Sequence, residues 1–171
     1  MNKKVSPKTF SRYVAIQALY NSNFQNDYEI VKNDFLDTNE FKLQFDFKMN
    51  LHRYKLNKNF LKTLLVTFNQ EKNKVDGLIE SNLQKNWNLK RIPVVLLSIL
   101  RVAVTEMIVS KHTSIGIIVS EYIMFTESFY TDNEYLFTNA ILEKIYLNLQ
   151  QKNTFNEWRT KNHPKIFFTP S

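Results

Sequence analysis

Apolar residues along most of the chain recur at intervals of three and four, the spacing that places them on one face of an α-helix. The most apolar segment is 94–109 (VVLLSILRVAVTEMIV), where the polar residues Ser98, Arg101, Thr105 and Glu106 form only a narrow stripe. A helix that is apolar around most of its circumference must be surrounded by other helices. A membrane span needs ~20 apolar residues with few charges, and this segment is shorter and carries two charges. We therefore predict a central core helix here and no transmembrane segment.

The same periodicity predicts further helices on both sides of this segment. Ser6-Pro7 is typical of an N-cap followed by proline at the first helical position, and Thr131 with Glu134 forms a capping-box pattern before the last helix. The stretch FKLQFDF alternates like a strand but has no visible partner, so we predict a loop over 37–58. The expected helices cover residues 7–24, 29–36, 60–68, 75–83, 94–109, 115–129 and 137–149.

Composition supports an all-helical chain in a reducing compartment. Only two glycines and four prolines occur in 171 residues, fewer than a sheet with tight turns usually requires. The length fits one domain. The absence of cysteine excludes disulfides and cysteine-ligated metals, and the N-terminus lacks the apolar region of a secretory signal. We expect an all-α cytoplasmic protein.

The charge of the chain favours an acidic partner. The net charge is +7 and the isoelectric point is near 9.5, which favours attraction to nucleic acid without proving it. The basic residues that open the chain precede the first acidic residue, Asp27. Two of them are four apart and share one side of the predicted first helix, either as a phosphate-contacting surface or as an ordinary solvated face. These basic residues are Lys3, Lys4, Lys8 and Arg12.

A basic segment with interspersed aromatic residues, 152–171, follows the last predicted helix. Aromatic rings beside cations can stack on single-stranded bases. An appendage packed on the body, or an unstructured tail, explains the same composition. We divide the chain into a helical domain over 1–151 and a tail over 152–171.

The motifs of common enzymes and metal sites are missing. The two glycines are isolated, which excludes a glycine-rich phosphate loop, and the three histidines lack metal-ligand spacing. No nucleophile lies beside an evident base. We therefore expect no enzyme, no metal and no cofactor. Four polar residues in or beside apolar helical segments are predicted to be structural: Arg101, Glu106, Glu121 and Asn139. Arg101 and Glu106 are five residues apart on one helix, so they should contact different neighbouring helices.

Several short motifs follow one another in an order and spacing that resemble the NusB family of transcription antitermination factors. The resemblance covers about residues 8–149, apart from the divergent segment 37–58. The motifs are AIQALY (15–20), Val75-Asp76 with Ile79, Trp87 with Leu89 and Arg91-Ile92, ILRVAVTE (99–106), Ser120-Glu121, Ser128-Phe129 and FTNAILEKI (137–145).

This resemblance implies an all-α fold of about seven helices, arranged as two small helical subdomains packed crosswise. It implies an RNA-binding antitermination factor that acts on the single-stranded box A element of ribosomal RNA leaders. The implied partners are the small-subunit ribosomal protein NusE and the RNA polymerase antitermination complex. The alternative is a helical protein-interaction module of the same type with weakened RNA binding.

The resemblance also implies binding residues. Lys8 and Arg12 occupy basic positions of the family's RNA-binding stretch, with Lys3 and Lys4 just upstream, and Phe137 matches an aromatic residue that lies near RNA.

Tyr20 matches a tyrosine at the NusE contact. Leu96 stands where the family commonly has an acidic residue tied to NusE binding, so the NusE interface there is either lost or remade by apolar contact, and we take Leu96 as a candidate for the remade contact. Ala140 replaces a family glycine.

Overall fold

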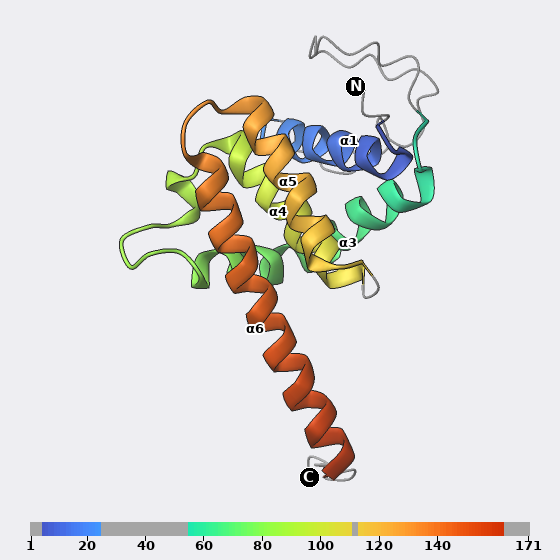
Figure 1. Ribbon diagram of the computed structural model, residues 1–171, viewed down its shortest axis with the longest axis vertical. Coiled ribbons are helices and arrows are strands. Elements are labelled where there is room, and N and C mark those ends of the chain that lie inside the picture. Colours follow the sequence, from blue (N-terminus) through green and yellow to red (C-terminus); the bar gives the residue numbers. More distant parts are fainter. Residues whose placement is uncertain (1–4, 25–54, 111–112, 163–171) are drawn as a thin grey trace.

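The computed structural model describes residues 5–24, 55–110 and 113–162, with side chains described through residue 151. Within these residues the chain is all-α and contains no strand. Five α-helices and one 3-10 turn are present, and Figure 1 shows α4 among the other helices of the body. Their bounds are α1 Pro7–Ser22, α3 Lys58–Ser81, η2 Leu89–Arg91, α4 Val94–Val109, α5 Ile115–Phe129 and α6 Glu134–Asn162.

The predicted fold class is confirmed, but the expected number of about seven helices is wrong for the described residues. Segments 60–68 and 75–83 belong to one helix, α3, and the helix expected over 29–36 lies outside the described residues. Polar residues at 69–74 interrupt the apolar pattern, which is why the sequence suggested two helices. The helix bends there instead of ending, because Glu71 leaves the helical region at φ −107° and ψ 15°. The bend lets both halves bury their apolar faces.

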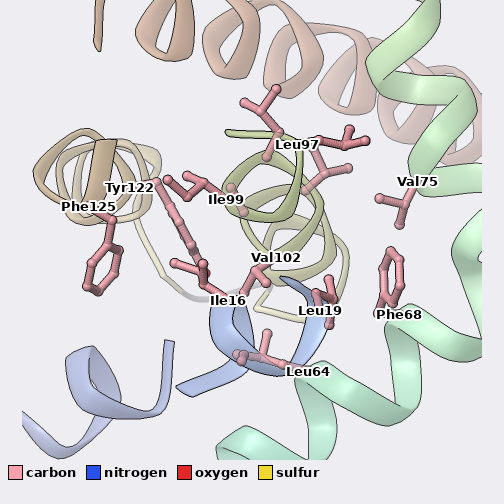
Figure 2. Packing of buried hydrophobic residues seen from close by; sticks show 14 of the residues in the cluster. Ile16, Leu19, Leu64, Phe68, Val75, Leu97, Ile99, Val102, Tyr122 and Phe125 are labelled. Atoms are coloured by element: carbon pink, nitrogen blue, oxygen red, sulfur yellow. The ribbon is translucent and has the colours of Figure 1, made fainter. Parts of the chain in front are cut away.

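Helix α4 is the core helix that its sequence predicts. It packs against α1, α3, α5 and α6. Ile99 is fully buried and Val102 nearly so; Figure 2 shows both near Ile16 of α1 and Tyr122 of α5. The buried residues of all five helices form one continuous cluster. This single core does not by itself separate the helices into two groups, so the division into two subdomains stays a prediction.

The helix starts follow the predicted capping residues only in part. The Ser6 side chain accepts a hydrogen bond from the backbone N–H of Thr9 at 3.0 Å, which confirms the N-cap of α1. Pro93 is the cap residue of α4. Glu134 is the first residue of α6, not the third as a capping box with Thr131 requires.

Helix α6 crosses the predicted boundary between domain and tail. Its first half packs through Ile141, Leu142 and Ile145, all buried. Its second half continues to Asn162 and projects away from the other helices in Figure 1. Residues 152–162 of the predicted tail are thus helical, and 163–171 lie outside the described residues. No helix in the described part of the chain combines the length and apolarity that crossing a membrane requires.

Candidate nucleic-acid interface

Arg12, predicted to contact RNA, is buried in the structure. Its side chain is 4% exposed, and its guanidinium donates to both carboxylate oxygens of Glu106, at 2.6 and 2.8 Å. A third bond, at 3.2 Å, reaches Glu121 of α5. The Tyr122 hydroxyl donates to Glu106 at 2.7 Å. This network joins α1, α4 and α5 through charge-assisted hydrogen bonds, which are stronger than neutral ones.

Electrostatics keep two members of this network, Arg12 and Tyr122, protonated. Burial alone would lower the pKa of Arg12, but the hydrogen bond and negative charge of Glu106 outweigh it and hold that pKa well above its ordinary value. Burial, and then the charge of Glu106, raise the pKa of the Tyr122 hydroxyl well above its usual range. Both groups therefore stay protonated at neutral pH. The predicted phosphate contact does not hold for Arg12, because its guanidinium is enclosed between two carboxylates.

Lys8 lies one turn before Arg12 and is exposed. Its Nζ lies 5.4 Å from the ring centroid of Phe60, and the Arg12 guanidinium lies 5.3 Å from the same ring. Phe60, at the start of α3, therefore supports both cations, but only the lysine remains accessible to a phosphate. Lys3 and Lys4 lie outside the described residues. Lys8 is the basic site residue that the structure leaves open to solvent.

Phe137 lies at a second place, on the first turns of α6. It is half-buried, and its ring centroid lies 6.0 Å from that of Trp87, with the planes tilted by 35°. Beside these rings is a cavity of about 150 Å³ between the end of α3, the loop after it and α6. Its lining residues are Asn82, Leu83, Gln84, Trp87, Phe137, Ala140, Ile141 and Lys144. We call this the Trp87 pocket.

The walls of the Trp87 pocket are held in place by polar contacts. Asn148 of α6 donates through its amide to the side-chain oxygen of Asn82 at 2.8 Å, which ties α6 to the end of α3. Arg91 lies 5.6 Å from the Trp87 ring centroid and donates to the Asn86 carbonyl at 2.8 Å. The first contact holds the start of the loop against α6, and the second joins two residues within the loop. Trp87 was not predicted to be a site residue, although its position among the basic residues of KNWNLKR (85–91) was a usable signal.

Arg101 and Glu106 are structural and contact different helices, as predicted. Arg101 donates to both oxygens of Asp76 on α3, at 2.8 and 2.9 Å, and to Asn23 after α1 at 3.3 Å. Glu106 instead faces α1 and α5. Glu121 belongs to the same structural network through Arg12 and through Thr9, which donates to it at 3.1 Å. Asn139 is half-buried on α6, and its structural role stays a prediction.

We expect Arg101→Ala to lower the free energy of unfolding by about 1–3 kcal/mol, since it removes two hydrogen bonds to a charged group. The loss is smaller than for a fully buried pair, because the Asp76 side chain is 19% exposed and water can solvate it. Urea denaturation of parent and variant measures the difference. Matched destabilisation in Asp76→Asn would place the effect in this pair, whereas unchanged stability of Arg101→Ala would contradict a structural role.

Comparison with known proteins now adds to these observations. The model of the NusB family matches residues 9–147, most of the chain and all five helices at least in part. This chain belongs to the NusB family.

Individual relatives match over a similar share of the chain. The transcription antitermination protein NusB of Rickettsia typhi is 28% identical over 147 residues, which cover 83% of this chain and 92% of that protein. The solved structure of T. maritima NusB superposes with a TM-score of 0.66 at 24% identity, covering 82% of this chain and 91% of that one. A structure of antitermination factors NusB and NusE in complex with dsRNA gives 0.65 at 18% identity, covering 82% and 96%. At these identities the two structures show a shared fold.

The two residues that the family resemblance assigned to a protein partner have different surroundings. Tyr20 is half-buried near the end of α1, and its ring centroid lies 5.0 Å from that of Phe24, whose side chain is 67% exposed. An accessible aromatic pair is a suitable contact for a protein partner.

Leu96, in contrast, is interior. It is 3% exposed and belongs to the continuous core, as does Leu97. The expected apolar interface at Leu96 is therefore wrong. The reason is that α4 is enclosed from its first full turn onward, so a leucine that replaces a family acid turns inward to the core.

Proposed function

We propose that this protein is an RNA-binding transcription antitermination factor of the cytoplasm. It would act on the single-stranded box A element of a ribosomal RNA leader, together with the ribosomal protein NusE and the RNA polymerase antitermination complex. Family membership and the names of its relatives support this role. The observation that carries it is Phe137, whose ring borders an open pocket that also contains Lys144. The helical domain over 1–151 would supply the binding surface, and the role is binding, not catalysis.

The proposed RNA surface has two parts with different duties. Lys3, Lys4 and Lys8 would contact phosphates, which gives attraction with little sequence preference, because phosphates are alike along the strand. Phe137 would stack on a base, and base contacts supply preference in single-stranded RNA. Helices α1 and α6 both pack on α4, so the core fixes the spacing between these parts.

Salt dependence tests the phosphate contacts. Three lysine contacts on a single strand predict a slope of log K against log salt of about −2, since each contributes ~0.7. Lys8→Ala should make this slope shallower by ~0.7 and weaken binding to unrelated RNAs similarly. Lys72→Ala is the matched control: it removes an equally charged, exposed lysine, but from α3 and not from α1, and it should leave the slope unchanged. Identical slopes for parent and Lys8→Ala would contradict the phosphate contact.

A second series tests stacking. Phe137→Leu keeps an apolar side chain against Trp87 but removes the aromatic face, and it should weaken binding by ~1–3 kcal/mol at an unchanged salt slope. Thermal melting of the variant separates this loss from a loss of folding. Parent-like affinity for box A RNA in a folded Phe137→Leu protein would reject the stacking role.

The second candidate function is a helical protein-interaction module with weakened RNA binding. The burial of Arg12 favours it, because it removes one basic residue from the expected RNA surface. The pair of half-buried Tyr20 and exposed Phe24 would then be the main functional contact. If the protein is an interaction module, Phe24→Ala should weaken binding to the ribosomal partner. Lys8→Ala and Phe137→Leu should then leave the affinity for RNA unchanged.

A further inference from the structure

We propose that the Trp87 pocket binds one unpaired nucleobase of an RNA strand, with Trp87 as a second stacking residue beside Phe137. This inference rests on the proposed function and specifies the form of its ligand. It adds a pocket and a residue, Trp87, that neither the family match nor the names of the relatives assign. The size and chemistry of the pocket, its walls and the charges around it support this role.

The pocket is large enough for a base. Sites for drug-sized molecules typically enclose ~300–1,000 Å³, so the cavity of about 150 Å³ has room for a small planar ring system. The sugar and phosphate of the same nucleotide would remain outside, in water. A base that enters while its backbone stays in solvent is how proteins commonly read single-stranded RNA.

The chemistry of the pocket suits a nucleobase. Trp87 is 42% exposed although it is a large aromatic residue, so much of its surface is available to a ligand. The remaining walls combine apolar contact from Leu83, Ala140 and Ile141 with the exposed side chain of Gln84, whose amide can pair with the edge of a base. Stacking against aromatic side chains is tolerant of sequence, because every base has a π-face.

The charges around the pocket favour a polyanion. Lys144 lines it, no carboxylate is among its lining residues, and the Arg91 guanidinium lies over the Trp87 ring. Lys85 and Lys90, in the same loop, are exposed. Together with the net charge of +7, this setting would place phosphates of the strand among cations while one base occupies the cavity.

The base must be unpaired. A base inside a duplex is stacked on both faces and paired along its edge, and extracting it costs a few kcal/mol. The pocket is lined by the segment that follows α3, in which Arg91 is hydrogen-bonded to Asn86, and by helix α6, so its walls are already in place without RNA. Preformed pockets avoid the cost of ordering on binding, which favours a strand that presents a free base.

The fluorescence of Trp87 offers a direct test in the full-length protein. The chain has two tryptophans, so Trp158→Phe leaves Trp87 as the sole reporter. A single-stranded box A oligonucleotide should quench its emission saturably, at the concentrations where binding occurs. The same sequence in a perfect duplex should not. In a series of oligonucleotides that each lack one base, quenching should be lost when the missing base is the one that occupies the pocket.

Substitutions test the pocket by two independent routes. Ala140 is exposed on α6 and lines the cavity, so Ala140→Leu should fill the pocket without removing any core contact. We expect Ala140→Leu and Trp87→Ala each to weaken single-strand binding roughly 5- to 150-fold, the range for loss of one stacked base, at an unchanged salt slope. Trp87→Phe should restore most of the affinity. Ser120→Leu, on the exposed face of α5, is the matched control for added bulk.

The outcomes separate this inference from the proposed function. If RNA binds the Trp158→Phe protein without changing Trp87 emission, and Ala140→Leu binds like the parent, the pocket does not hold a base and the proposed function stands alone. Equal quenching by single strand and duplex also overturns the inference. If Ala140→Leu loses only its affinity for the ribosomal partner, the pocket accepts a protein side chain instead. If neither form of RNA binds the parent protein, both proposals fail.

Discussion

Replacing Arg12 with alanine is expected to lower the free energy of unfolding by about 3–5 kcal/mol, the usual effect of removing one partner from a buried ion pair. Glu106 is fully buried, and without Arg12 its carboxylate would keep, among the described residues, only the hydrogen bond from Tyr122. A charge in that position has no access to water, so the loss falls on folding. Urea denaturation measures it, and a domain of this size shows it as a clear fall in the midpoint.

Lys8→Ala is the matched control for this prediction. It removes a cation one turn away that is exposed, and its effect should stay within ±0.5 kcal/mol. A second control replaces the network as a whole, as Arg12→Met with Glu106→Leu and Tyr122→Phe. Because no buried charge or hydroxyl of these three is then left unpaired, much of the lost stability should return. Normal stability with lost RNA binding in Arg12→Ala would instead make Arg12 a ligand contact.

Lys8 is exposed and Arg12 is buried, a difference that the sequence does not predict. Four residues apart on one helix, they share a side, and nothing local separates them. The partner that draws Arg12 inward lies 94 residues later in the chain. The sequence did indicate that Glu106, in the most apolar helix, needs a partner, but several cations were available. Only the packing of α1 against α4 decides which one it takes.

The central helix could be predicted from the sequence, whereas the Trp87 pocket could not. The pattern of 94–109 was enough to predict α4, its bounds and its burial, because one continuous periodic segment carries that information. The Trp87 pocket instead combines residues near 82–87 with residues near 137–144. A single sequence does not specify how two segments so far apart approach each other. Both residues belong to family motifs, but only the fold shows that Trp87 lies beside Phe137.

Leu96 is the residue for which the family resemblance pointed to the surface and the structure points to the core. Leu96→Glu should prevent folding or lower the free energy of unfolding by several kcal/mol, because a carboxylate in an apolar interior must be protonated or left unpaired. Leu96→Ala, which adds no charge, should cost about 2–5 kcal/mol through lost burial and the cavity that remains. Circular dichroism and urea denaturation would follow both variants.

Val94→Glu provides the matched control on the same helix. Val94 is 39% exposed at the first position of α4, where water can solvate a carboxylate. A negative charge in the first turn of a helix is also favoured by the helix dipole, by ~0.3–1 kcal/mol. Val94→Glu should therefore fold normally while Leu96→Glu does not. The opposite result, a folded Leu96→Glu protein with tighter binding to the ribosomal partner, would place Leu96 on the surface and restore the interface that the family resemblance implied.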